Sequence, residues 1–329
     1  MTKLVNSDGK IDFGVYSNVI SDINYMDYNL EKPMGGKVTG FFKKFRFNQF
    51  NFIGVMGPDL MAGFAIVDFK GLSNGFFYIY DRKTNQLFET KKIALGLNAS
   101  IDTNPSAMNS QFKFPGLQIN ISGNKVFAKG KNILIDATLD TENVEPLRVC
   151  ARAGYRGWVF TEKTSPVKIS GKLEYNGKTI NLSSPEYMAM IDWSAGFMRR
   201  NTFWNWASIA GTLPDNRSIG LNLASGVNET AFTENAFWID GKMIKTDMVN
   251  FQFNSDDLMA EWKITSYDKK IDLVFTPENY REEKTNAIFI GTRFTQLMGT
   301  FDGTFTTDDG EQIKVENLPG WAEDHYAKW

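Results

Sequence analysis

The chain has 329 residues, of which 42% are hydrophobic and 22% charged, and a formal net charge of −2. This composition excludes wholesale disorder, and the length allows two domains. Because Lys and Arg are scattered and nearly balanced by Asp and Glu, nothing indicates nucleic acid or an anionic membrane surface as a partner. The single cysteine, Cys150, excludes an internal disulfide, and the single histidine, His325, excludes the usual multi-histidine metal sites.

In the first half of the chain we expect neither a secretory signal nor a membrane span. Residues 1–9 have no apolar core of the kind that signal peptides carry. The longest apolar stretch, residues 50–69, is interrupted by Gly54, Gly57 and Pro58, which is typical of two strands around a turn. We therefore predict a cytoplasmic protein without a transmembrane segment.

Turn signals recur along the chain. Asn176-Gly177, Asp240-Gly241 and Asp309-Gly310 each separate two short runs with strand-like alternation, the pattern of a tight β-hairpin. Aromatic residues make up 14% of the chain and also favour sheet. No segment of helical length has the apolar periodicity of an amphipathic helix.

These signals predict an all-β protein built from two antiparallel barrels, or strongly curved sheets, packed side by side. The polar segment 161–166, which ends in Ser165-Pro166, is the expected connector. It places one barrel-like domain at residues 1–163 and a second at residues 164–329. A single large continuous sheet is the alternative.

The first group of candidate site residues follows Asp192. On a strand, Trp204, Trp206 and Ser208 share one face, and Asn205 lies on the other. Two indoles on one face either fill a core or form the wall of an apolar ligand cavity. Asp192 either forms an ion pair with Arg199 or Arg200, or points into a dry cavity as a proton donor.

A second group spans residues 218–238. Gly220 sits inside a predicted strand, which marks a bulge or a close backbone approach, and Asn222 lies on the same face. Glu234 and Trp238 share a face of the next strand, so a carboxylate and an indole could contact one ligand. The alternative for Glu234 is a solvated strand end.

The third group closes the chain. A short C-terminal helix would place Trp321, His325 and Trp329 on one face and could plug one end of a barrel. His325 is the natural acid–base candidate, because its unperturbed pKa is the side-chain pKa nearest neutrality. The alternative is a packed structural histidine.

Motifs that bind cofactors or mark common hydrolases are missing. The sequence has no glycine-rich phosphate loop, no G-x-S-x-G, no H-E-x-x-H and no C-x-x-C. We therefore expect chemistry that needs neither a cofactor nor a metal.

Six segments together resemble a bacterial family described as domain of unknown function 2804. They are residues 192–193, 204–208, 220–224, 233–236, 272–277 and 320–325. That family is more distantly similar to two-domain lipocalin-like proteins, which include carotenoid hydratases and cyclases. The resemblance implies two lipocalin-like barrels and an apolar or amphipathic small-molecule ligand.

The first functional hypothesis is an enzyme that acts on a lipid-like or isoprenoid substrate by hydration, isomerisation or cyclisation. Its proton-transferring groups would be Asp192, Glu234 or His325. Its ligand-binding residues would be Trp204, Asn205, Trp206, Ser208, Asn222 and Trp238. The alternatives are a non-catalytic carrier of hydrophobic metabolites and, third, an interaction protein whose Trp-rich half is only core. Substrate and oligomeric state stay open.

Overall fold

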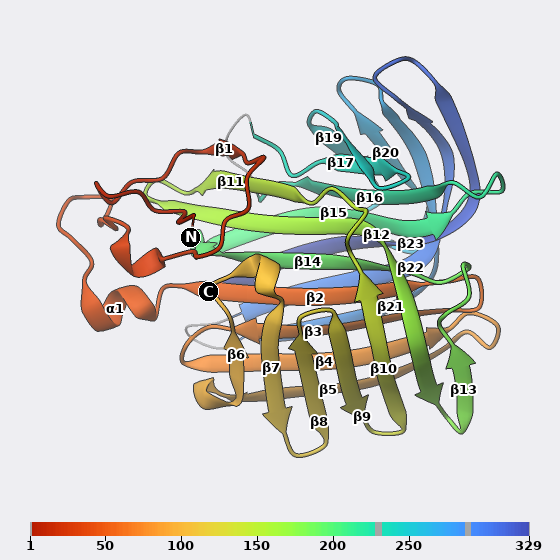
Figure 1. Ribbon diagram of the computed structural model, residues 1–329, viewed down its shortest axis with the longest axis horizontal. Helices are drawn as coiled ribbons and strands as arrows, with labels where there is room; N and C mark the ends of the chain where they lie inside the picture. The colour runs from red at the N-terminus through yellow and green to blue at the C-terminus, as the bar shows by residue number, and fades with distance from the viewer. Residues whose placement is uncertain (1, 228–231, 287–290, 329) are drawn as a thin grey trace.

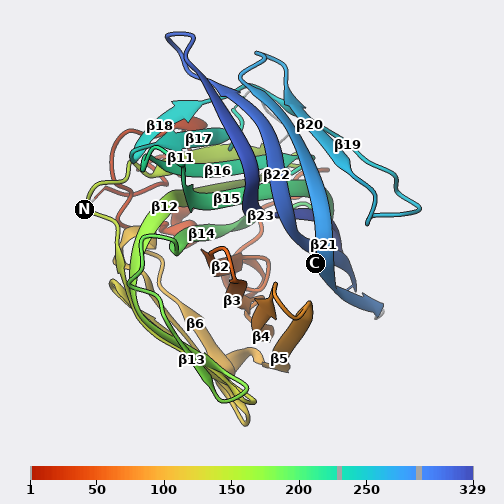
Figure 2. The same cartoon turned by 90° about the vertical axis from the view of Figure 1, so that its right-hand side faces the viewer.

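The computed structural model describes residues 2–227, 232–286 and 291–328. These residues form two curled antiparallel sheets that pack side by side, which confirms the predicted fold class. Figures 1 and 2 show both sheets and the curl of each. Among the described residues the longest helix is α1, Gly40–Lys44, and none has the length and hydropathy of a membrane span.

The first sheet contains the strands from the first 197 residues in the order β5-β4-β3-β2-β14-β12-β10-β9-β8-β7-β6, with β1, β11 and β13 paired at its side. Their bounds are β1 Gly14–Val15, β2 Asn48–Met56, β3 Leu60–Asp68, β4 Leu72–Asp81, β5 Gln86–Leu95, β6 Ala99–Ile101, β7 Asn109–Phe114, β8 Leu117–Ser122, β9 Lys125–Gly130, β10 Ile133–Asp140, β11 Leu147–Ala153, β12 Gly157–Tyr175, β13 Lys178–Asn181 and β14 Met188–Phe197. Three short 3-10 helices complete this part, at Tyr25–Asp27, Gly96–Asn98 (η2) and Pro105–Ala107.

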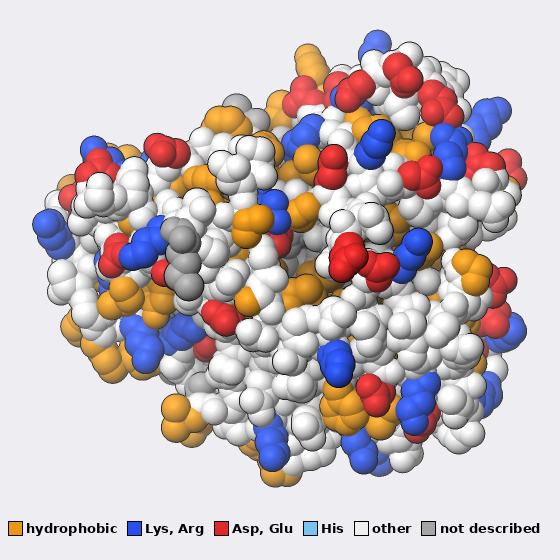
Figure 3. Space-filling view, viewed as in Figure 1, with side chains coloured by type: hydrophobic (Ala, Val, Ile, Leu, Met, Phe, Trp, Pro, Cys, Tyr) orange, Lys and Arg blue, Asp and Glu red, His pale blue; other side chains and the backbone are white. Residues whose placement is uncertain are grey.

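The second sheet has the order β18-β17-β16-β15-β23-β22-β21-β20-β19. Its strands are β15 Asn201–Thr212, β16 Ser218–Ser225, β17 Ala236–Ile239, β18 Lys242–Lys245, β19 Val249–Gln252, β20 Trp262–Ser266, β21 Ile271–Asn286, β22 Gly291–Thr306 and β23 Gln312–Lys328. On the face seen in Figure 3, Lys and Arg side chains are mostly interspersed with Asp and Glu.

Local sequence explains the hairpins. Asn176 and Gly177 have φ values of 47° and 76°, and Asp240 and Gly241 have 50° and 77°, so both pairs adopt the positive φ that a tight hairpin turn requires. At the third predicted hairpin only Gly310 has a positive φ, 87°, and the loop between β22 and β23 is longer. All three predicted turns connect adjacent antiparallel strands.

The predicted C-terminal helix is wrong. Residues 312–328 form β23, which pairs with β15 on one side and β22 on the other. A central strand satisfies its backbone groups through both neighbours, and this pairing outweighs the weak helical spacing of Trp321 and His325. Trp329 lies outside the described residues.

The predicted connector at 161–166 lies within β12, which pairs with β14 and β11 along this segment. The chain passes from the first sheet to the second later, between Phe197 and Asn201. The division into domains at residues 163 and 164 stays a prediction.

The described residues form four hydrophobic clusters. One lies within each curled sheet, a smaller one joins β11 and β12 to β17, and another lies between the sheets. This inter-sheet cluster joins Phe52, Tyr78 and Met190 of the first sheet to Trp206 and Trp321 of the second. It brings the two sheets into contact around the site described below.

At Gly220, β16 packs closely against the backbone of β12, which is the close backbone approach that a glycine inside a strand predicts. A Cβ added there would lie 2.4 Å from the carbonyl carbon of Ser165 and 2.5 Å from the nitrogen of Pro166. Backbone atoms cannot rotate away, so we expect Gly220→Ala to lower the free energy of unfolding by about 1–3 kcal/mol. Urea denaturation measures this change.

The matched control is Gly291→Ala, because the atom nearest to a Cβ there is the Thr285 carbonyl oxygen at 3.4 Å, an ordinary contact. Equal stability of the two variants would contradict the close approach of β16 and β12.

Candidate functional site

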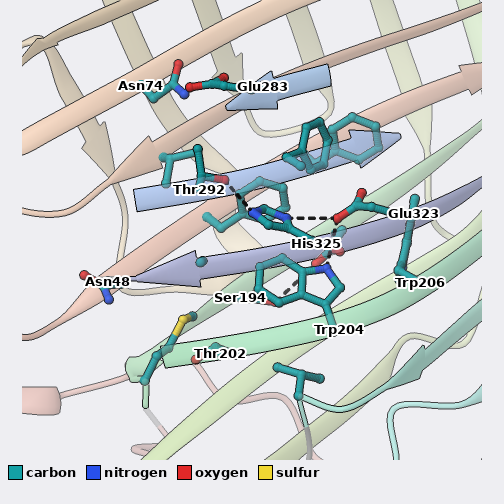
Figure 4. Close-up of a pocket in the computed structure, with 18 of the residues that line it drawn as sticks. Asn48, Asn74, Ser194, Thr202, Trp204, Trp206, Glu283, Thr292, Glu323 and His325 are labelled. Carbon is teal, nitrogen blue, oxygen red and sulfur yellow. Dashed lines mark hydrogen bonds and ion pairs between the residues drawn. The ribbon is translucent and has the colours of Figure 1, made fainter. Parts of the chain in front are cut away.

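A cavity of about 240 Å³ lies between the two sheets. One water needs about 10–15 Å³ by the same kind of measure, so the cavity has room for a small molecule. Its walls are largely apolar and include, from the first sheet, Phe50, Phe52, Val67, Phe69, Leu72 and Phe76, and from the second, Trp204, Trp206, Ala224 and Phe294. Figure 4 shows the part around His325.

Strand register places the aromatic side chains of the cavity wall beside His325. Trp204 on β15, His325 on β23 and Phe294 on β22 lie directly opposite one another on three adjacent strands. The His325 ring centroid is 3.9 Å from that of Trp204 and 4.8 Å from that of Phe294. These contacts hold the imidazole in one orientation against the cavity.

Both ring nitrogens of His325 have hydrogen-bond partners. Nδ1 lies 3.2 Å from Oε1 of Glu323, and Nε2 lies 3.0 Å from the hydroxyl oxygen of Thr292. Trp204 Nε1 donates to the same Glu323 oxygen at 2.9 Å. In the tautomer whose Nδ1–H donates to Glu323, Nε2 accepts from Thr292, and a carboxylate then orients the ring as it orients many general bases. The dashed lines in Figure 4 mark these contacts.

Hydrogen bonds connect the second carboxylate oxygen of Glu323, through Gln296, to Tyr78 of the inter-sheet cluster. Gln296 Nε2 donates to Oε2 of Glu323 at 3.3 Å, and the Tyr78 hydroxyl donates to Oε1 of Gln296 at 2.6 Å. Burial raises the pKa of Tyr78 strongly, so its hydroxyl keeps its proton and acts as a donor. Side chains of both sheets therefore fix the carboxylate that orients His325.

A buried ion cluster lies on the same cavity. Lys163 Nζ is 2.5 Å from Oδ2 of Asp192 and 3.1 Å from Oε2 of Glu234, and all three side chains are buried. Ser194 also donates to Oδ1 of Asp192 at 3.2 Å. One ammonium thus faces two carboxylates away from solvent.

Burial raises the pKa of Asp192 above its usual value; Lys163 opposes this shift and Glu234 adds to it. Burial alone would lower the pKa of Lys163, but Asp192 and Glu234 outweigh it and the pKa is raised. The fully ionised cluster would carry one excess negative charge, so the dry site favours keeping a proton on a carboxyl. Asp192 is therefore the carboxyl of this cluster whose raised pKa favours the protonated form.

Arg281 of β21 adds a third polar group to the wall. Its Nε and Nη2 donate to Oε1 of Glu89, at 3.0 and 2.5 Å, while Nη1 has no hydrogen-bond partner in the described structure. The guanidinium lies 4.1 Å from the ring centroid of Phe76 and 4.9 Å from that of Tyr78. These aromatic faces hold the cation in place.

Five of the predicted site residues line this cavity: Asp192, Trp204, Trp206, Glu234 and His325. Neither alternative for the two carboxylates holds, since Asp192 pairs with Lys163 rather than with an arginine, and Glu234 is buried rather than solvated.

Four other predicted residues are not among the cavity residues. Asn205 faces away and donates to Asp324. Asn222 is buried and accepts from Trp206 Nε1, while Ser208 is buried without a hydrogen-bond partner in the described structure. Trp238 packs in a separate cluster beside β11, and its Nε1 donates to the Glu145 carbonyl at 2.7 Å.

The sequence patterns did not predict three polar residues that line the cavity. Lys163 lay in the segment taken as a polar connector, and Arg281 lies in a charged run typical of a solvated strand end. Glu323 had a usable signal: in a strand it shares a face with His325, two residues later, but the predicted helix placed the two apart.

No three His, Cys, Asp or Glu side chains within residues 2–227, 232–286 and 291–328 are arranged to hold a metal ion.

A family model described as domain of unknown function, DUF2804, matches residues 1–329, which confirms the family resemblance of the motifs. Comparison with curated proteins gives no match. Three solved structures have a similar fold. A protein described as an AttH from Nitrosomonas europaea is 13% identical, covers 87% of this chain and 94% of its own, and has a TM-score of 0.53.

CghA, solved with Sch210972, is 10% identical over 99% of this chain and 96% of its own, with a TM-score of 0.54. Kievitone hydratase from Nectria haematococca is 11% identical, covers 97% of this chain and 98% of its own, and has a TM-score of 0.49. At such identities the similarity shows the fold alone.

Proposed function

The chain belongs to the family described as a domain of unknown function, DUF2804, and we propose that this member is an enzyme that transfers protons to and from a hydrophobic small molecule in the cavity. The substrate class is lipid-like or isoprenoid, and the reaction is a hydration, isomerisation or cyclisation. CghA, which has a similar fold, was solved with Sch210972, and this supports a small-molecule ligand for the present chain.

The observation that carries the proposal is the pairing of an acid and a base on one apolar cavity. Asp192 has a raised pKa and lines the same space as His325, which Glu323 orients. A carboxyl whose pKa is raised, facing the same apolar space as an imidazole oriented by a carboxylate, is an arrangement suited to general acid–base catalysis.

In a hydration, the carboxyl of Asp192 would donate its proton to one carbon of a double bond as the π bond breaks. A water oxygen would then bond to the other carbon and release a proton to His325. Solvent exchange would return the proton from His325 to Asp192. An isomerisation or cyclisation would use the same two groups, with the leaving proton taken from carbon instead of water.

The apolar wall would supply the rest of the rate enhancement. It would hold the substrate between Trp204, Trp206 and Phe52 and would exclude bulk water, which strengthens every electrostatic interaction in the site.

A first test asks whether the cavity holds a ligand. Native mass spectrometry of protein purified from two hosts is expected to show a bound hydrophobic compound that organic extraction recovers. Ala224→Phe would fill the cavity wall at a position where the side chain is buried. We expect this variant to lose at least about tenfold of the ligand occupancy, because the added ring competes for the same space.

Ala224→Ser is the control at the same position and should keep its ligand. Protein that binds nothing from either host, nor from a lipid extract added afterwards, would contradict a ligand cavity.

The second candidate function is a carrier of hydrophobic metabolites, which the largely apolar wall favours. Incubation with the extracted compound separates the two candidates. An enzyme converts it, and substitution of His325 stops the conversion; a carrier returns it unchanged.

A further inference from the structure

Hydrophobic side chains are exposed at the end of the molecule that carries α1. Phe41 and Phe42 expose 69% and 72% of their surface, and the Phe41 ring lies beside those of Phe42 and Phe45. Leu95 and Leu97, at the end of β5 and in η2, expose 77% and 102%. Large apolar side chains gathered this way on a surface mark an interaction site rather than ordinary surface variation.

The two groups adjoin each other and the cavity. A Cβ added to Gly71 would lie 3.2 Å from the Phe45 ring, and the next residue, Leu72, is the register partner of Leu95. Leu72 and Ile93 also line the cavity, and Ile93 is itself half exposed. The exposed apolar surface therefore continues into one rim of the cavity.

Several cations lie close to the three phenylalanines in the sequence. Residues 32–46 contain no Asp or Glu, and within them Lys32, Lys37, Lys44 and Arg46 are exposed and form no ion pair within the described part of the chain. Figure 3 shows Lys and Arg beside hydrophobic side chains at this end of the molecule. The near-neutral total charge of the sequence conceals this local cluster.

We propose that this basic aromatic surface, comprising Phe41, Phe42, Phe45, Leu95 and Leu97 with the four cations of residues 32–46, docks the protein on an anionic lipid membrane. Protruding aromatic side chains insert at the acyl boundary of a deformable bilayer, while Lys and Arg are attracted to anionic headgroups. If the proposed function holds, the membrane is also the source of the hydrophobic ligand, because the cavity rim lies at the docked face.

A second copy of the chain fits this surface less well. A two-fold interface would place the same surface against itself and bring the four cations into opposition with their equals, which is unfavourable. A membrane with anionic lipid offers the complementary charge.

Vesicle flotation tests the docking without any substrate. We expect the wild-type protein to float with vesicles of equal parts phosphatidylcholine and phosphatidylglycerol, much less with phosphatidylcholine alone, and less again as salt is raised. The double variant Phe41→Ser/Phe42→Ser should bind the mixed vesicles at least about tenfold more weakly, because it removes two inserted rings. Lys44→Gln/Arg46→Gln should weaken binding to the mixed vesicles only.

Tyr267→Ser is the matched control, since Tyr267 is 80% exposed but lies between β20 and β21 of the second sheet. It should bind as the wild type does, and equal thermal unfolding of all variants checks their folding. Absence of wild-type binding, or equal binding by the double phenylalanine variant, overturns the proposal. So does a wild-type dimer that the double variant dissociates, because a second copy would then be the occupant. None of these results depends on turnover, so failure of the docking is distinguishable from failure of the proposed enzyme.

Discussion

Replacing His325 with alanine is expected to slow conversion of the extracted substrate by about 10²–10⁴-fold, the usual contribution of a general base. The loss should appear in kcat with little change in KM, because Trp204, Trp206 and Phe52 still hold the apolar body of the ligand. Added imidazole should restore part of the activity by entering the vacated space. Steady-state kinetics with and without imidazole measures both effects.

Glu323→Gln should also lower kcat, but by a smaller factor than the alanine variant of His325. The imidazole keeps its ring contacts but loses the carboxylate that orients it. Asn205→Ala is the control, because Asn205 faces away from the cavity toward Asp324 on the same pair of strands. An alanine variant of His325 that converts substrate at close to the wild-type rate would remove the histidine from the mechanism.

Replacing Lys163 with methionine is expected to lower the free energy of unfolding by about 3–5 kcal/mol near neutral pH, because it leaves two buried carboxylates without their cation. Asp192→Asn should cost far less, since Lys163 and Glu234 remain as a balanced pair at 3.1 Å. The triple variant Lys163→Met/Asp192→Asn/Glu234→Gln removes every charge of the cluster and should recover much of the lost stability. Urea denaturation of the three variants measures these differences.

The effect of Lys163→Met should depend on pH with a definite sign. Without Lys163, the folded-state pKa values of the two buried carboxyls rise above the unfolded values of about 4. At pH values between the unfolded pKa values and the raised folded-state pKa values, the folded protein binds more protons than the unfolded chain. Its free energy of unfolding therefore falls as pH rises. In the wild type, Asp192 contributes a pH dependence of stability with the same sign, because its pKa is already raised. The contribution is smaller, because Lys163 opposes the shift. A destabilisation by Lys163→Met that is equal at pH 5 and pH 8 would contradict the unpaired-carboxylate explanation.

Local patterns were enough for the class of fold and for part of the site. Asn176-Gly177 and Asp240-Gly241 determine their hairpins because each pair supplies the positive φ values that the turn needs. Strand alternation alone placed Trp204 and Trp206 on one face, and both line the cavity. Asp192, Glu234 and His325 were predicted as isolated candidates, without their partners.

The partners were decided by strand pairing between distant segments. Lys163 meets Asp192 because β12 and β14 pair in a register that sets these two residues opposite each other, although 29 positions of sequence separate them. Glu323 orients His325 only because residues 312–328 are extended between β15 and β22; a helix would turn the two side chains apart.

By itself, the sequence determined the all-β class, the hairpins and the strand face that carries Trp204 and Trp206, because turn chemistry and alternation are properties of neighbouring residues. Only the tertiary structure decided that Trp238 and Asn205 lie away from the cavity, that Lys163 and Glu323 complete it, and that the exposed Phe45 lies near Gly71, beside the cavity residue Leu72. Those outcomes depend on which strands pair and in which register, and the backbone hydrogen bonds of a sheet can be satisfied by many partners.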